Sequence, residues 1–186
     1  MKIISLFIFL ISGAVVSAQS FWKMTGVETD KNALHSGILY SRDPEAIFIS
    51  TYNMGIFRST NKGASWDHVL SLPRDQPVTA LFISKNGTVL AGGAGRIYLG
   101  EANRDKWEEI PLELPYIRSF AEDRNGNLYA CSPVSGGIFR SSDNGKSWIA
   151  FTNGLPTTYV NNIIADGNGN LFCTLQQDDN GLNGGL

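Results

Sequence analysis

The tryptophans of this chain fall on a single period. Trp66, Trp107 and Trp148 are each 41 residues apart, and Trp22 lies 44 residues before Trp66. Pairs of Leu-Pro and Asn-Gly recur along the chain at a similar spacing. A repeat of this length is one small structural unit written several times, and such units bury their apolar faces only against each other. The repeat therefore constrains the fold more than any other feature of the sequence.

Each unit predicts four short strands. In the unit that begins at Val78, apolar or alternating runs cover Val78–Ile83, Thr88–Ala91, Arg96–Leu99 and Trp107–Ile110. Asn86-Gly87 separates the first two runs, and we expect a two-residue hairpin turn there, with positive φ at both residues. A helical repeat would need runs of about 10–12 residues at a 3.6-residue period. The expected fold is all-β, a β-propeller of four-stranded blades with about four blades present and the last incomplete.

The repeat also divides the chain. We expect a secretory signal peptide at 1–18 and a partial propeller at 19–186, made of a lead-in strand at 19–37 and units at 38–77, 78–116, 117–159 and a truncated 160–186. The last unit contains runs for two strands only. Because an open propeller exposes sheet edges, we expect completion by further blades or self-association. A self-sufficient four-bladed ring is the alternative.

The first residues have the pattern of an export signal. Lys2 is followed by an apolar stretch, and the small residues Val16-Ser17-Ala18 precede Gln19. The stretch is shorter than the roughly 20 residues of a spanning helix, so an uncleaved membrane anchor is the weaker reading. We therefore expect a secreted protein, or one in the periplasm or cell envelope, with no membrane span in this segment. A net charge of −2 argues against a nucleic-acid partner.

Cys131 and Cys173 are the two cysteines of the chain. Two cysteines do not make a disulfide framework. Aligned on their Asn-Gly turns, the two residues are one step out of phase, so their side chains should point to opposite faces of their sheets. We expect two free, buried thiols.

A motif links the third and fourth runs of two units. Residues 141–148 read Ser-x-Asp-x-Gly-x-x-Trp, and residues 59–66 repeat the pattern with Asn61 in place of Asp143. The short carboxylate or amide can accept hydrogen bonds from backbone N–H groups of its own turn. The glycine supplies a positive φ, and the tryptophan can bury a large surface between sheets. In the intervening unit only Trp107 of the pattern remains.

This motif closely resembles the Asp-box, or BNR, repeat of sialidases, xyloglucanase-type glycosidases, sortilin-type receptors and photosystem-assembly propellers. The resemblance covers nearly the whole chain after residue 18. It implies that the box is a structural turn, away from the ligand face. The residues that it marks as structural are Ser59, Asn61, Gly63, Trp66, Trp107, Ser141, Asp143, Gly145 and Trp148.

The enzymes of that family would require groups that this segment lacks. A sialidase-like site needs converging arginines, but Arg58 and Arg140 occupy the same place on third strands of two blades. A xyloglucanase-like site needs a carboxylate in the stretch 51–58, which contains no Asp or Glu. We therefore assign no catalytic residue within these residues.

We also expect no metal and no cofactor. His35 and His68 have no second ligand at a suitable spacing. Residues 178–181 could hold Ca²⁺ only loosely, and a solvated loop is the stronger reading. The glycines at 92–95 precede a strand and so do not form a phosphate loop. Asp123 and Asp166 precede Asn-Gly turns, which we expect them to cap.

One end of the propeller gathers residues that could bind a ligand. The second-to-third and fourth-to-first connections share the face opposite the Asp-box turns. The candidate binding residues there are Tyr52, Asn53, Tyr116, Tyr159, Gln176, Gln177 and Asp178. Exposed aromatics beside amides suit a glycan or a peptide, although the tyrosines could instead only pack the linkers.

These observations predict an exported, non-catalytic propeller that acts as a binding or scaffold module for a glycan, peptide or protein. One alternative is the N-terminal part of a secreted glycoside hydrolase, sialidase- or xyloglucanase-like, whose catalytic carboxylates lie downstream. A second alternative is a sensor or receptor ectodomain.

Overall fold

The repeat folds into successive antiparallel β-sheets. The computed structural model describes residues 35–42, 45–52 and 54–176, and these residues contain three four-stranded sheets and one two-stranded sheet, without a helix. Sheet I contains β1 (His35–Arg42), β2 (Glu45–Thr51), β3 (Gly55–Ser59) and β4 (Asp67–Ser71); sheet II contains β5 (Val78–Ile83), β6 (Thr88–Gly93), β7 (Arg96–Glu101) and β8 (Glu108–Pro111); sheet III contains β9 (Ser119–Glu122), β10 (Leu128–Cys131), β11 (Ile138–Ser141) and β12 (Ile149–Ala150); sheet IV contains β13 (Val160–Ala165) and β14 (Leu171–Leu175). Each sheet pairs its strands in chain order, as the sequence predicts for an incomplete propeller.

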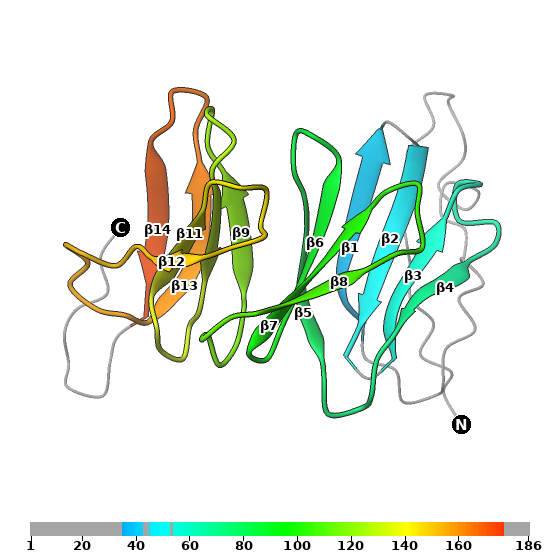
Figure 1. The fold of residues 1–186 in the computed structure, drawn as a ribbon, viewed down its shortest axis with the longest axis horizontal. Coiled ribbons are helices and arrows are strands. Elements are labelled where there is room, and N and C mark those ends of the chain that lie inside the picture. The colour runs from blue at the N-terminus through cyan, green and yellow to red at the C-terminus, as the bar shows by residue number, and fades with distance from the viewer. Residues whose placement is uncertain (1–34, 43–44, 53, 177–186) are drawn as a thin grey trace, which may run out of the picture.

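The sheets follow one another around an inner edge formed by their first strands. Figure 1 shows sheet I at the right, sheet II in the centre and sheets III and IV at the left. The first strands β1, β5, β9 and β13 contact each other in succession. Hydroxyl groups join them, because Thr79 Oγ1 donates to Ile117 O at 2.5 Å and Ser119 Oγ donates to Ile163 O at 3.3 Å. β1 begins at His35, inside the range that we assigned to a lead-in strand.

The hairpins between first and second strands differ from the predicted two-residue turns. Ser84 N donates to Thr88 O at 2.9 Å, so three residues form the turn, and only Gly87 among them has positive φ (+85°). Such a turn ends on a left-handed glycine. The reason is the side chain at its start, because Thr88 N donates to Ser84 Oγ at 3.0 Å and this bond holds the longer turn closed.

Asp123 and Asp166 hold the corresponding turns of sheets III and IV, as predicted. The carboxylate of Asp123 accepts hydrogen bonds from Asn125 N at 2.8 Å and Asn127 N at 2.9 Å. Asp166 accepts from the N–H groups of Asn168 and Asn170, each at 2.8 Å. Each carboxylate therefore replaces the backbone partners that the turn residues lack.

Register identifies two faces that all four sheets share. Phe48, Leu90, Tyr129 and Phe172 occupy equivalent positions on the second strands, opposite Leu39, Phe82, Ala121 and Ile164 of the first strands. We call the face that carries these pairs the forward face, and the opposite one the rear face. The forward face of each of sheets I, II and III packs on the rear face of the next sheet.

Three apolar cores result from this packing. Between sheets I and II, Phe48 packs with Val89 and Ala91 of the next sheet. Between sheets II and III, Leu90 packs with Leu128 of the next sheet, and Tyr129 lies in the core between sheets III and IV. Phe48, Leu90 and Tyr129 are at most 4% exposed. Since apolar burial supplies most of the stability of such stacks, each sheet depends on its neighbours.

The cysteines are both free, Cys131 buried and Cys173 half-buried. Cys131 lies on the forward face of sheet III and Cys173 on the rear face of sheet IV, so both belong to the core between these sheets. The predicted opposite phases therefore place the two side chains in one core, since a forward face meets a rear face. Burial raises the pKa of Cys131 to about 12 and also raises the pKa of Cys173.

Candidate functional site

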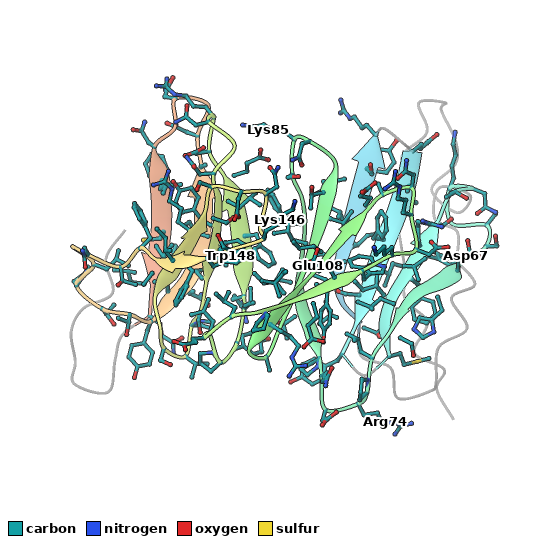
Figure 2. The ribbon with its side chains drawn as sticks, in the orientation of Figure 1. Asp67, Arg74, Lys85, Glu108, Lys146 and Trp148 are labelled. Carbon is teal, nitrogen blue, oxygen red and sulfur yellow. The ribbon has the colours of Figure 1, made fainter. Side chains whose placement is uncertain are left out.

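The connections between strands gather at two opposite ends of the sheets. We call one end the linker face: it contains the β2–β3, β6–β7 and β10–β11 connections and the linkers 72–77, 112–118 and 151–159. The other end, the turn face, contains the first hairpins and the third-to-fourth connections. Figure 2 labels Arg74 on the linker face and Lys85 on the turn face, at opposite ends of the molecule.

Backbone hydrogen bonds fasten the linker face. Gly95 N donates to Leu114 O, and Leu112 N donates to Gly95 O, both at 2.9 Å. Farther along the chain, Gly137 N donates to Thr158 O at 2.9 Å. These bonds join a second-to-third connection to a linker in sheets II and III, so the backbone of this face has a fixed shape.

The tyrosines predicted as ligand contacts lie on three connections of this face. Tyr52 follows β2 and is 41% exposed, while Tyr116 and Tyr159 precede β9 and β13 and are half-buried. Within the described residues, no hydrogen bond or ring contact joins the three side chains to one another. The structure therefore places them on one face but does not gather them into a cluster.

The other candidate residues lie at or beyond the limits of the description. Gln176 is half-buried, and its N–H donates to Tyr159 O at 2.8 Å, which brings Gln176 beside one of the tyrosines. Asn53, Gln177 and Asp178 lie outside the described residues.

The turn face contains the Ser-x-Asp-x-Gly turn, in which the polar groups bond within the turn. Ser141 Oγ donates to Asp143 Oδ1 and accepts from Gly145 N, both at 2.8 Å. Asp143 also accepts from Ser147 N at 2.9 Å and from the Ser147 hydroxyl at 2.5 Å. Trp148 Nε1 donates to Gly145 O at 2.8 Å, which fixes the indole over the turn.

The Asn variant of the turn has the same bonds with one donor reversed. Asn61 Oδ1 accepts from Ser65 N at 2.8 Å, as Asp143 does from Ser147. The amide of Asn61 then donates to Ser65 Oγ at 2.8 Å, whereas Asp143 accepts from its serine. Because a serine hydroxyl can donate or accept, either residue closes the turn. Gly63 and Gly145 have φ of +85° and +88°, as predicted for the glycine of this motif.

The unit without the motif keeps its tryptophan for packing. Gly100 stands where the other units have Ser59 and Ser141, and a Cβ on it would lie 2.8 Å from the Trp107 ring. A serine at this position would therefore clash with Trp107. In this unit Arg104 N donates to Glu101 O at 3.2 Å, so a backbone bond closes the turn.

The hydrogen bonds of the carboxylates lower their pKa values. Bonds from Ser147, and then from Ser141, lower the pKa of Asp143 to about 2. Burial would raise the pKa of Asp123, but bonds from Asn127, Asn125 and the Tyr129 hydroxyl together lower it. A carboxylate held ionised in this way is a poor proton donor at neutral pH.

The two repeated arginines do not converge on a common site. Arg58 Nη2 forms an ion pair with Asp105 Oδ1 at 2.8 Å, between sheets I and II. Arg140 Nη2 donates to Asn127 Oδ1 at 2.9 Å within sheet III. Both arginines occupy third strands, β3 and β11, away from the inner edge.

The described residues contain no group of three or more His, Cys, Asp or Glu side chains that could hold a metal ion. His68 has other contacts: its Nε2 lies 2.7 Å from Met54 O, and its ring stacks on Phe57 with centroids 4.4 Å apart. The side chain of His35 lies outside the described residues. No helix in the described part of the chain is long and apolar enough to cross a membrane.

The sequence gave no signal for one set of contacts on the turn face, between sheets II and III. Lys85 N donates to Glu122 Oε2 at 2.6 Å, and Lys85 Nζ donates to Asp123 O at 2.8 Å. Asn86 Nδ2 donates to Asn144 Oδ1 at 2.8 Å. These bonds join the first hairpin of one sheet to turns of the next, so the residues of this end hold the sheets together.

Comparisons with known proteins add the following. No family model and no curated protein matches the chain. Among solved structures, it is similar to the extracellular domain of BT4673 from B. thetaiotaomicron (19% identity, TM-score 0.62, covering 75% of this chain and 20% of that one). It is also similar to virginiamycin B lyase from Staphylococcus aureus (22%, 0.62, covering 78% and 50%) and to the WD40 propeller domain of Doa1 (14%, 0.59, covering 76% and 48%).

The chain therefore spans half or less of the length of these three proteins. At such identities the likeness concerns the fold alone. What the sheets and the comparisons show together is that the chain has the fold of a β-propeller.

Proposed function

We propose that this chain is an exported, non-catalytic β-propeller of the Asp-box type, which binds a glycan, a peptide or a protein through its linker face. The observation that carries the proposal is the division of labour between the two faces. On the turn face, the hydrogen bonds of Asp143 and Asp123 go to their own turns. On the linker face, backbone bonds fix the connections while Tyr52 stays exposed and Tyr116 and Tyr159 stay half-exposed.

The chemistry of the linker face favours a sugar or a peptide. A tyrosine offers a flat apolar ring for stacking and a hydroxyl for hydrogen bonding. A rigid backbone lowers the entropy lost on binding. Gln176, whose backbone is bonded to Tyr159, adds an amide beside one ring.

A second candidate is a sensor ectodomain. One solved structure with the same fold is described as the extracellular domain of a one-component system. An export signal at residues 1–18 would be compatible with this role. Both candidates require the same ligand-binding face.

Binding of the chain 19–186 to a glycan array and a peptide array tests the proposal. We expect binding that the triple variant Tyr52→Ala/Tyr116→Ala/Tyr159→Ala weakens at least about tenfold, as loss of aromatic contacts should. Lys146→Ala, an exposed change on the turn face, is the matched control and should bind normally.

A panel of chromogenic glycosides tests the non-catalytic part of the proposal. We expect no turnover by residues 19–186. Turnover that a single carboxylate substitution abolishes would overturn this part, and binding lost with Lys146→Ala but kept in the tyrosine variant would overturn the choice of face.

A further inference from the structure

One face of sheet IV is exposed where its counterparts are buried. Phe48, Leu90 and Tyr129 are 1%, 0% and 4% exposed, whereas Phe172, at the same position of sheet IV, is 55% exposed. Ile164, which pairs with Phe172, is 59% exposed. In sheets I to III this forward face lies under the next sheet. The forward face of sheet IV is therefore an apolar packing surface without a described neighbour.

The rear face of sheet I shows the matching exposure on its first strand. Ile38, Leu81, Phe120 and Ile163 occupy equivalent positions, each paired with the same position of its second strand. Phe120 and Ile163 are 7% and 1% exposed because they pack on the preceding sheet, but Ile38 is 55% exposed. Tyr40, on the same strand and face, is 50% exposed.

These two surfaces are the halves of one kind of junction. Each of the three junctions inside the chain joins a forward face to a rear face. The exposed residues on the forward face of sheet IV are Asn162, Ile164, Phe172 and Thr174, so no charged group would lose its hydration there. The surface that fits this forward face is a rear face of the same repeat, and the chain carries one with Ile38 and Tyr40 exposed.

We propose that two copies of this chain associate head to tail, with the forward face of sheet IV of each copy on the β1 rear face of the other. Each contact is heterologous, and a pair of such contacts closes a ring. Two copies carry eight sheets between them, which is within the usual range of about 4–8 propeller blades. This inference does not depend on the ligand proposed above.

Sedimentation of the chain 19–186 over a range of concentrations tests the proposal. We expect a particle of twice the chain mass. Ile38→Asp and Phe172→Asp should each weaken the association at least about tenfold, because each places a charge in an apolar contact. Val134→Asp is the matched control, since Val134 is 51% exposed but lies in the β10–β11 connection, and this variant should associate normally. All three residues are exposed, so the variants should keep the wild-type circular dichroism spectrum.

Mixing the two variants distinguishes head-to-tail from tail-to-tail association. In a mixture, the intact forward face of Ile38→Asp can meet the intact rear face of Phe172→Asp, so the mixed pair should form although neither variant pairs alone. A wild-type chain that stays monomeric would overturn the proposal. An Ile38→Asp variant that still dimerises would also overturn it, because the copies would then pair through sheet IV alone.

Discussion

Replacing Ser141 by alanine tests whether the Ser-x-Asp-x-Gly turn is structural. The Ser141 hydroxyl is buried, accepts from Gly145 N at 2.8 Å and donates to Asp143 Oδ1 at 2.8 Å. Without it, the buried N–H of Gly145 has no partner, which costs about 1–3 kcal/mol. The lost bond to the carboxylate adds about 1 kcal/mol, since Asp143 keeps its bonds from Ser147. We expect the free energy of unfolding to fall by about 2–4 kcal/mol.

Thermal unfolding, followed by circular dichroism at one fixed protein concentration, measures this loss. For a chain of this size about 1 kcal/mol corresponds to about 2–4 °C, so the Tm should fall by roughly 5–10 °C. Ser142→Ala, at the exposed neighbouring position, should change the free energy by less than about 0.5 kcal/mol. If Ser141→Ala unfolds like Ser142→Ala, the turn does not support the fold and our reasoning is wrong.

Three further predictions concern acid stability, packing and thiol reactivity. The pKa of Asp143 is about 2 in the folded protein, below its ordinary value of 3.8; the stabilisation is therefore present above about pH 4 and lost as pH falls toward 2, and because the carboxylate is exposed we expect only about 1 kcal/mol. Urea unfolding at several pH values should show this loss in the wild type and not in Asp143→Asn; an equal loss in both would contradict it. Leu90→Ala should cost about 2–5 kcal/mol because Leu90 is 0% exposed between two sheets, and a urea midpoint equal to that of the wild type would argue against the packing. Burial holds the pKa of Cys131 at about 12, so iodoacetamide at pH 8 should label Cys131 only after unfolding; mass spectrometry that finds it labelled in the native protein would refute the buried position.

The spacing of the tryptophans was sufficient to predict the sheets and their order. This succeeded because every unit must pack on its neighbours, so the repeat itself carries the long-range information. The turns were harder to predict, since Asn86-Gly87 fits a two-residue hairpin by propensity. The Ser84 side chain instead stabilises a three-residue turn, a contact that depends on its position in the structure.

Contacts between sheets were the least accessible from the sequence. The bonds of Lys85 to Glu122 and Asp123 depend on how two units are placed, and neither residue type nor spacing signals them. The positive φ of Lys62, +60°, was equally hidden, because lysine has no preference for that region. The tyrosines of the linker face could be placed on one face by topology, but their side-chain arrangement could not.

Hydrogen exchange of the chain 19–186, measured by mass spectrometry with and without a ligand found on the arrays, tests the central claim most directly. The account predicts slower exchange on binding in the linker-face segments 112–118 and 151–159, which contain Tyr116 and Tyr159. The turn-face segments 60–66 and 142–148 should exchange at the same rate with and without ligand. Protection of those turns, with the linkers unchanged, would contradict the assignment of the binding face.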